Sequence, residues 1–438
     1  MATYFLWSGA AGTGTGADWT NAFTTYTAAL AAATADADII KVHKTHTEEL
    51  AVDTTYTHQN NISVICVDKD ASDALSTMGT AAWIGNSTVN RAVTMAGAFR
   101  VFLHGITLRT AGATVDSINL AATDGGHFEY ESCYFWQGNT GANGGIGVGA
   151  ADAQAFVKAK NCTWRFNLAT HRISVASKLV IEGGSLAATG TIPTGGLFIA
   201  ATVDPAGPSV DAIGFDLSYL GSNPIVGNAT TNAFTVRLSQ CKLGTSFVLL
   251  ATQTNLNRSS AEVYAFDCAS GDAHGLFAYA NPMGSVVSDT GIFFTSGAAA
   301  QSWKIVTTAN CSYYTPFETP WFGYYNTTTT SITPYVEILR DGSATAYDDD
   351  QVWLDVMAKT NSGSTQSALT TDRMTLLGTP ANHVAGAGLG SWTGESGTAW
   401  SGKMVMASLT PAEVGHIQAR IVVGEPSITV YADPQVRT

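Results

Sequence analysis

Two carboxylate side chains of this sequence are candidates for cleaving a glycosidic bond. Glycoside hydrolases use a pair of Asp or Glu side chains, about 5 Å apart in retaining enzymes and farther apart in inverting ones. Glu182 and Asp216 would form such a pair on equivalent outward positions of adjacent turns. The excursion between them, residues 186–210, either walls a groove or hides a further turn that separates them by about 10 Å. Solvated carboxylates are common on such faces, so we predict no catalytic pair and no enzyme.

Three consecutive aspartates, Asp348, Asp349 and Asp350, are candidate calcium ligands, because Ca²⁺ prefers carboxylate oxygens. The spacing of an EF-hand loop is missing around them, and an acidic turn also explains the run. His43 and His46 form an HxxH motif with carboxylates nearby. Residues three apart on a strand face opposite sides, so these histidines should not share a metal. We predict that the protein needs no metal, nucleotide or organic cofactor.

Four cysteines stand in one recurring local frame. Apolar or small residues lie five and three places before each cysteine, and a polar or small residue lies directly before it. Such irregular repeats, with a mean spacing of about 26 residues, are typical of a solenoid in which each repeat stacks on the last. A search with this frame gives nine equivalent positions: Ile106, Cys133, Cys162, Gly184, Ser218, Cys241, Cys268, Gly291 and Cys311.

The strand pattern selects the type of solenoid. Val157 and Ala159 alternate with polar residues, and no amphipathic helix lies between repeats, so we predict a parallel β-helix. The cysteine position then points inward, where a small thiol stacks about 4.8 Å from its counterpart on the next turn. The six cysteines lack close pairs, so we predict buried, reduced thiols rather than disulfides or a zinc site.

Charges at the outward positions support this register. Glu129 and Glu131 in one turn stand opposite Lys158 and Lys160 in the next. Opposite charges across neighbouring strands stabilise a sheet by a few tenths of a kcal/mol per pair. The facing charges therefore have the opposite signs that a correct register predicts.

The two ends of the chain differ from the coil. Residues 20–35 show helical periodicity and predict an amphipathic helix that caps the open end, with Asp18 or Thr20 as its N-cap. After Cys311 an aromatic, proline-rich stretch is followed by alternating strands. We predict an all-β chain with a capping segment (residues 1–36), a right-handed single-stranded parallel β-helix (37–315) and a β-sandwich (316–438).

Composition excludes several classes of partner. The chain has 438 residues, a formal net charge of -13 and 13% charged residues, which disfavours binding to nucleic acid. Apolar runs long enough to span a membrane are missing, and the N-terminus does not read as a secretory signal. We therefore expect a soluble protein made in the cytosol.

The sequence resembles a group of virion structural proteins of tailed bacteriophages, the head-decoration and tailspike-like group with a right-handed parallel β-helix. The resemblance rests on GTGADWTNAF and its Ala-rich helix, on SWKIVTTAN at 302–310 and on the SITVYADPQV ending. It implies a virion component assembled in the bacterial cytoplasm, and it transfers no active site. We predict a non-enzymatic capsid decoration or head-attached protein that binds the major capsid protein or other virion proteins. The alternative is a receptor-binding tail fibre or tailspike that binds a host surface glycan, with or without cleaving it.

One outward patch suggests self-association. Tyr264 and Phe266 occupy the positions that Glu129 and Glu131 hold in an earlier turn. Adjacent outward aromatic residues indicate a covered surface. Because the resemblance implies three-fold symmetry, we predict a homotrimer that uses this face.

Overall fold

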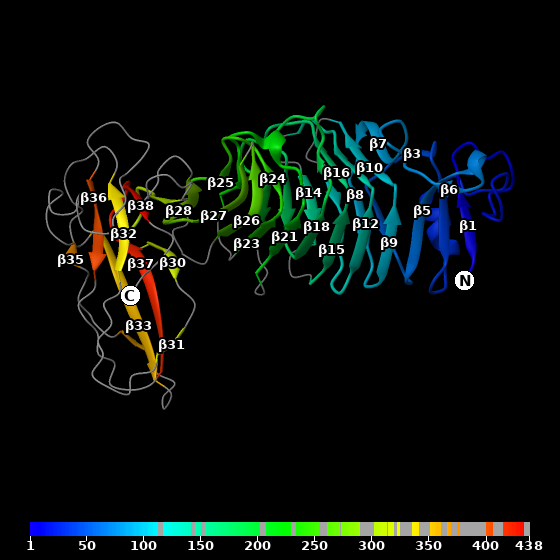
Figure 1. The fold of residues 1–438 in the computed structure, drawn as a ribbon. Coiled ribbons are helices and arrows are strands. Elements are labelled where there is room, and N and C mark those ends of the chain that lie inside the picture. The colour runs from blue at the N-terminus through cyan, green and yellow to red at the C-terminus, as the bar shows by residue number, and fades with distance from the viewer. Residues whose placement is uncertain are drawn as a thin grey trace. The chain divides into compact units, whose positions relative to one another are not determined.

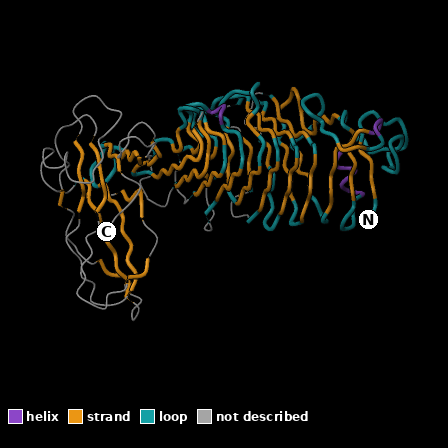
Figure 2. The backbone as a smooth tube through the Cα atoms, viewed as in Figure 1, coloured by secondary structure: helices purple, strands orange, loops and turns teal. Residues whose placement is uncertain are grey.

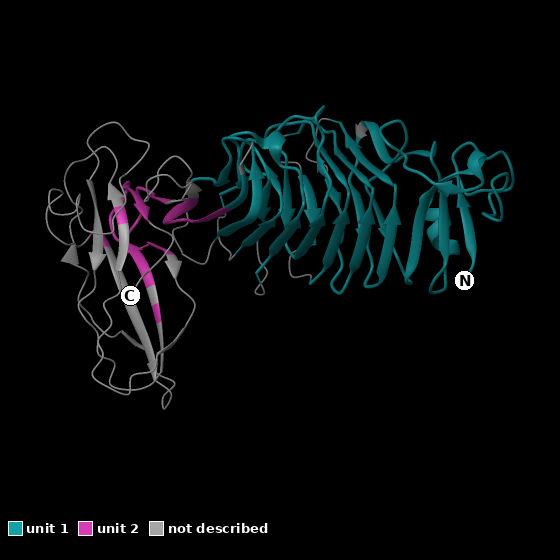
Figure 3. Cartoon of the chain, in the orientation of Figure 1, with its two compact units in different colours: residues 1–276 teal, residues 277–438 magenta. Residues whose placement is uncertain are grey.

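Two compact units make up the structure, a computed structural model of the chain (Figure 3). They comprise Met1–Leu276 and Phe277–Thr438. The structure describes all residues except 113–116, 142–144, 150–153, 202–206, 229–233, 254–260, 272, 290–301, 313, 319–321, 325–334, 341–350, 361–365, 369–374, 377–399, 406–414 and 433–438. Within the described part, no helix is long and apolar enough to cross a membrane.

The first unit is a parallel β-solenoid of about eight turns (Figures 1 and 2). Each turn contributes short strands to parallel sheets that run along the coil. The first sheet contains β1 (Thr3–Leu6), β2 (Ile39–His43), β5 (Ile62–Asp68), β9 (Arg100–His104), β12 (His127–Glu131), β15 (Phe156–Lys160), β18 (Lys178–Glu182), β21 (Ser209–Ile213), β23 (Thr235–Ser239) and β26 (Glu262–Ser270).

Two further sheets complete the turns. The second contains β3 (Thr47–Glu49), β7 (Trp83–Asn90), β10 (Thr107–Ala111), β13 (Tyr134–Gln137), β16 (Thr163–Phe166) and β19 (Ser185–Leu186). The third contains β4 (Thr54–Thr57), β8 (Val93–Ala96), β11 (Ile118–Asn119), β14 (Gly145–Val148), β17 (Arg172–Val175), β20 (Phe198–Ala200), β22 (Pro224–Val226) and β25 (Val248–Leu250). The shorter elements of the unit are β6 (Ala74–Leu75), β24 (Lys242–Leu243) and the 3₁₀ helices η1 (Lys69–Ala71) and η2 (Ser218–Leu220).

Alternation along the strands fills the coil interior, as the sequence predicts. Strands β12 and β15 pair in parallel, with Phe128 opposite Val157 and Tyr130 opposite Ala159, and all four side chains are buried. Glu131 lies between such positions, faces outward and pairs with Lys160 at 2.7 Å. The period of two therefore separates a dry interior from a charged outer face.

The second predicted charge pair is arranged differently. Glu129 lies opposite Lys158 in the register, but its ion pairs join it to Arg100 at 2.6 Å and His127 at 2.9 Å. Lys158 pairs instead with Glu182 of the following turn at 2.7 Å.

A left-handed corner residue follows the first-sheet strand in seven successive turns. Its φ lies between 52° and 70°, a region that costs most residues about 1 kcal/mol or more and glycine little. The corner turns the chain so that the next residue points into the interior. The corner residues are Gly105, Ser132, Asn161, Gly183, Gly214, Gln240 and Asp267.

The inward position after the corner holds six of the nine residues of the predicted ladder. Ile106, Cys133, Cys162, Gly184, Cys241 and Cys268 all occupy it. All six cysteines of the chain are free and buried. Burial raises the pKa of the Cys66 thiol to about 12 and that of Cys133 well above its ordinary value, because the interior disfavours a thiolate.

Two predicted ladder positions are wrong and one lies outside the described residues. Ser218 belongs to η2, and the inward position of that turn is held by Phe215, which is buried and follows the corner Gly214. Cys311 is buried, but it belongs to the second unit, where its thiol approaches the carbonyl oxygen of Val423. Gly291 is not among the described residues.

The N-terminal helix is shorter than predicted. Helix α1 covers Tyr26–Ala32, and its N-cap is Thr25 rather than Asp18 or Thr20. Asp18 instead accepts a hydrogen bond from the backbone N–H of Asn21, within the loop that precedes the helix. Strand β1, which the sequence analysis missed, pairs in parallel with β2 ahead of the first full turn.

The second unit is built from antiparallel pairs. One group contains β28 (Gly284–Asp289), β29 (Ser302–Thr307), β38 (Thr429–Ala432), β32 (Tyr335–Arg340), β36 (Trp400–Val405) and β35 (Thr375–Leu376), and β27 (Ala273–Asn281) pairs with β28. The other contains β30 (Tyr314–Glu318), β31 (Phe322–Tyr324), β37 (Gly415–Val423), β33 (Val352–Thr360) and β34 (Gln366–Ala368). The parallel coil therefore ends near residue 276 and not at the predicted residue 315, while the β-sandwich stays a prediction.

Candidate functional site

A row of planar side chains crosses four strands of the coil on its outer surface. Trp83, Arg109, Trp136 and Arg165 come from β7, β10, β13 and β16, which are neighbours in the second sheet, and all four are half-buried. We call these four residues the Trp–Arg row.

The planes of the row are stacked on one another. The guanidinium carbon of Arg109 lies 4.5 Å from the ring centroid of Trp83 and 3.9 Å from that of Trp136. Arg165 lies 4.0 Å from the same Trp136 ring. Guanidinium groups at these distances are attracted to the ring faces by about 0.5–1 kcal/mol at exposed sites, and more where water is excluded. The row is therefore ordered before any ligand arrives.

Strand register explains why these residues meet. Arg109, Trp136 and Arg165 are direct partners in the pairing of β10, β13 and β16. The partner of Arg109 on β7 is Gly85, which has no side chain, so the Trp83 ring reaches the guanidinium from two residues away. Gly85 also has a φ of +141°, and a Cβ there would lie 1.9 Å from the Arg109 carbonyl oxygen. We infer that this position requires glycine.

A carboxylate closes one end of the row. Glu49 accepts hydrogen bonds from Trp83 Nε1–H at 3.2 Å, from the backbone N–H of Ser87 at 3.0 Å and from the Ser87 hydroxyl. Burial lowers the pKa of the Arg109 guanidinium, and the nearby Glu49 carboxylate opposes that change. Nε of Arg109 is buried and has no hydrogen-bond partner among the described residues. The outer edge of the row thus combines N–H donors with apolar ring edges.

Such an edge suits an extended, polyhydroxylated ligand. Rungs of a parallel sheet repeat about every 4.8 Å, comparable to the length of one sugar ring, so a glycan lying along the coil could place one unit per rung. Guanidinium N–H groups are donors only, and they suit hydroxyl or carboxylate oxygens as acceptors. The sequence analysis missed this row, although its members lie 26, 27 and 29 residues apart, which is one turn each.

The two candidate carboxylates do not occupy equivalent positions. Glu182 ends β18 and stands opposite Ile213, whereas Asp216 lies between Ser185 and Lys242 in single bridges that extend the second sheet. Burial favours the neutral acid at Asp216, but hydrogen bonds from Ser218 and the charge of Lys242 hold its pKa below the ordinary value. A general acid needs a raised pKa, so nothing in this arrangement favours that role.

The candidate metal ligands of the sequence do not come together among the described residues. Asp348, Asp349 and Asp350 lie outside the described residues. His46 accepts a hydrogen bond from the Ser8 backbone N–H through Nδ1, and its Nε2 lies 3.4 Å from Glu48. Its HxxH partner, His43, lies with Asp68 and Asp70 instead, a group that the sequence analysis did not find because the three residues come from adjacent turns.

Comparison with known proteins identifies no family for this chain. No protein-family profile and no curated protein matches the chain. Among solved structures, the chain is similar to the enzymatically active domain of tailspike protein 4 of bacteriophage CBA120, with a TM-score of 0.24 and 8% sequence identity. The alignment covers 95% of this chain and 66% of that one, so this chain spans less than two thirds of its length. At this TM-score the likeness carries no argument about ligand or reaction.

One prediction is nevertheless corrected at this point. The sequence predicts a protein without enzymatic activity, whereas the tailspike domain to which the chain is similar is described as enzymatically active. We do not maintain that prediction.

Proposed function

We propose that this chain is a receptor-binding protein of a phage tail, of the tailspike or tail-fibre type, whose coil binds a host surface glycan along the Trp–Arg row. The observation that carries the proposal is the stacked row itself, which lies on the outer surface and extends over four successive rungs of the second sheet. This role replaces the head-attached one predicted from the sequence, because a purely structural attachment does not need an outward, preordered row of N–H donors. In the same proposal, α1 covers the open end of the coil.

The row can be tested with a single substitution. We expect Trp136→Ala to weaken glycan binding more than tenfold, because the ring holds both guanidinium groups and truncation of a central aromatic anchor in a binding surface costs about 2 kcal/mol or more. Binding should be measured on arrays of bacterial surface polysaccharides and then titrated on the glycan that scores highest. Arg165→Lys, which keeps the charge but loses the plane, should bind weakly as well.

A matched control is Phe156→Ala. Phe156 is a half-buried outward aromatic residue of the first sheet, whose ring lies 4.6 Å from that of His127. We expect this variant to bind like the parent protein. Equal binding by Trp136→Ala and the parent would refute the glycan site, and labelled antibody on the head of intact virions rather than on the tail would refute the tail role.

The predicted homotrimer is a second part of the proposal. Phe266 is 66% exposed, and it shares an outward line with Ser239 and with Ile213, whose apolar side chain is also exposed. Tyr264 is half-buried, and its hydroxyl donates to Glu262. An exposed apolar line of this kind supports a covered surface between copies.

We expect sedimentation of the purified protein to give three times the chain mass of 45.7 kDa. Phe266→Glu should shift the protein toward the monomer, because a charge would then be buried in the interface. Tyr219→Glu, at another exposed aromatic residue, should leave the trimer intact. A parent protein that sediments as a monomer would contradict this expectation.

A further inference from the structure

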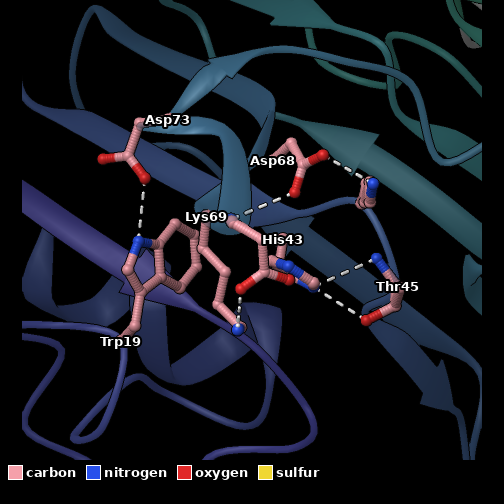
Figure 4. Close-up of polar contacts among 8 residues, drawn as sticks. Trp19, His43, Thr45, Asp68, Lys69 and Asp73 are labelled. Atoms are coloured by element: carbon pink, nitrogen blue, oxygen red, sulfur yellow. Dashed lines mark hydrogen bonds and ion pairs between the residues drawn. The ribbon is translucent and has the colours of Figure 1, made fainter.

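Three side chains with metal-binding atoms meet near the N-terminal end of the coil. His43 is the last residue of β2, Asp68 is the last residue of the adjacent strand β5, and Asp70 follows in η1. Their ligand atoms all lie within 4.8 Å of one another. Figure 4 shows His43 and Asp68 in this group, with Thr45 on the other side of the imidazole.

The imidazole of His43 lacks half of its hydrogen bonds. The residue is only 3% exposed, and its Nε2 is buried without a hydrogen-bond partner among the described residues. Leaving a buried polar atom unpaired costs about 1–3 kcal/mol. Nδ1 lies 2.7 Å from Thr45 Oγ1 and accepts a hydrogen bond from the Thr45 backbone N–H at 3.3 Å, and these contacts fix the ring orientation from the opposite side. An atom that binds Nε2 would therefore remove a cost that is already present.

Aromatic side chains enclose the imidazole further. The rings of Trp7 and Trp19 lie 5.2 Å and 5.6 Å from that of His43, and Trp19 is held in place by a hydrogen bond to Asp73 at 2.9 Å (Figure 4). The imidazole cannot turn to find another partner without disturbing this packing.

The carboxylates are each engaged by a lysine through only one oxygen. Lys44 binds Asp68 Oδ2 at 2.6 Å, and Lys69 binds Asp70 Oδ1 at 2.6 Å. Asp68 Oδ1 accepts the backbone N–H of Asp70 at 3.1 Å and retains a second lone pair. Both ammonium groups are carried on flexible stems and can move outward when a cation enters.

We propose that His43, Asp68 and Asp70 bind a divalent transition metal of the zinc type. One imidazole nitrogen and two carboxylate oxygens make a mixed donor set that Zn²⁺ accepts, whereas Ca²⁺ and Mg²⁺ prefer oxygen donors alone. Binding of a metal through Nε2 places the imidazole proton on Nδ1, so that Nδ1–H donates to Thr45 Oγ1 and the 3.3 Å hydrogen bond from the Thr45 backbone N–H is given up. The metal joins two successive turns, and the nearby lysine charges weaken its affinity.

Zinc titration of the full chain after treatment with a chelator tests this site. We expect one zinc ion to bind per chain and to raise the melting temperature. Asp70→Asn should weaken binding more than about tenfold and remove the rise in melting temperature. The Asp70 side chain is 70% exposed, so this variant should keep the fold. His43→Gln should lose binding as well.

Asp73→Asn is the matched control. Asp73 lies just after η1, three residues beyond Asp70, but it binds Trp19 and Lys41 and is not one of the proposed ligands. This variant should bind zinc with the affinity of the parent protein. The proposal is overturned if the parent does not bind zinc, or if Asp70→Asn binds it as tightly as the parent does, since zinc would then occupy other histidines or cysteines.

Discussion

Replacement of Trp164 by alanine should lower the free energy of unfolding by about 4 kcal/mol. Trp164 is the largest fully buried side chain of the described residues, and its ring lies 4.6 Å from that of Phe135 on the preceding turn. Truncation would open a cavity between stacked rungs, which cannot collapse without breaking the register of the second sheet. Denaturant-induced unfolding, followed by circular dichroism, measures the effect.

Two further variants make this result specific. Trp164→Phe should cost much less than Trp164→Ala, because Nε1 of Trp164 is buried without a hydrogen-bond partner in the described structure and the change removes that atom. Trp136→Ala removes an indole from the outward face of the preceding turn and should also cost less. If Trp164→Ala were no more harmful than Trp136→Ala, the inward and outward assignments would be wrong.

Stability should fall by about 3 kcal/mol as the pH is lowered from 6.5 to 4 because of His58 alone. Burial lowers the pKa of His58 from 6.5 to about 4. Its Nδ1–H donates to the Ala96 carbonyl oxygen at 3.0 Å, and its Nε2 accepts from the Tyr26 hydroxyl at 2.8 Å. Both nitrogens are thus satisfied in the neutral form, and burial disfavours the charged imidazolium.

The sign follows from the two pKa values. Between pH 4 and 6.5 the unfolded chain binds a proton at His58 that the folded chain does not, so acid favours unfolding. The buried Glu48 carboxyl accepts hydrogen bonds from the Tyr26 backbone N–H and the Tyr56 hydroxyl rather than from His58. Phe128 covers the other side of the imidazole, with ring centroids 5.3 Å apart.

Unfolding measured at several pH values in the parent protein and in His58→Gln isolates this contribution. The variant should be less stable at pH 7 and should lose less stability on acidification. Burial also lowers the pKa of His43 and His171, so both proteins retain a smaller decline of the same sign. Identical pH dependence in the two proteins would count against the buried network. His274→Gln, at an exposed histidine, serves as the control and should behave like the parent.

The coil could be predicted from the sequence because burial imposes a period of two on each strand. Val157 and Ala159 are buried, while Lys158 between them faces outward, and the same pattern recurs in the neighbouring turns. The small inward residues after the corner, mostly cysteine, made the repeat recognisable in the sequence. Local sequence is informative here because it reflects burial directly.

Two errors arose where that pattern is ambiguous. Ile213 is apolar but 47% exposed, and together with Phe215 it matched the search frame three residues out of register, so Ser218 was placed inward in error. Cys311 follows β29, a strand that pairs with β28 in the antiparallel direction. A period of two does not distinguish parallel from antiparallel pairing, because both leave alternate side chains on one face.

The candidate sites were harder to predict because they depend on contacts between turns. Trp83 meets Arg109 only because Gly85 leaves space opposite the arginine. His43 and Asp68 are 25 residues apart in the sequence and become neighbours only through the pairing of β2 with β5. Neither arrangement leaves a local motif.

The left-handed corner has a consequence for how such a chain can change in evolution. Successive corners are 22 residues apart between Asn161 and Gly183, but 31 apart between Gly183 and Gly214, and both intervals end at the same place in the rung. Residues can therefore be inserted elsewhere in a turn while the corner restores the phase of the next strand. Loops that reach toward a new ligand can be gained or lost one turn at a time, without disturbing the stacking of the turns on either side.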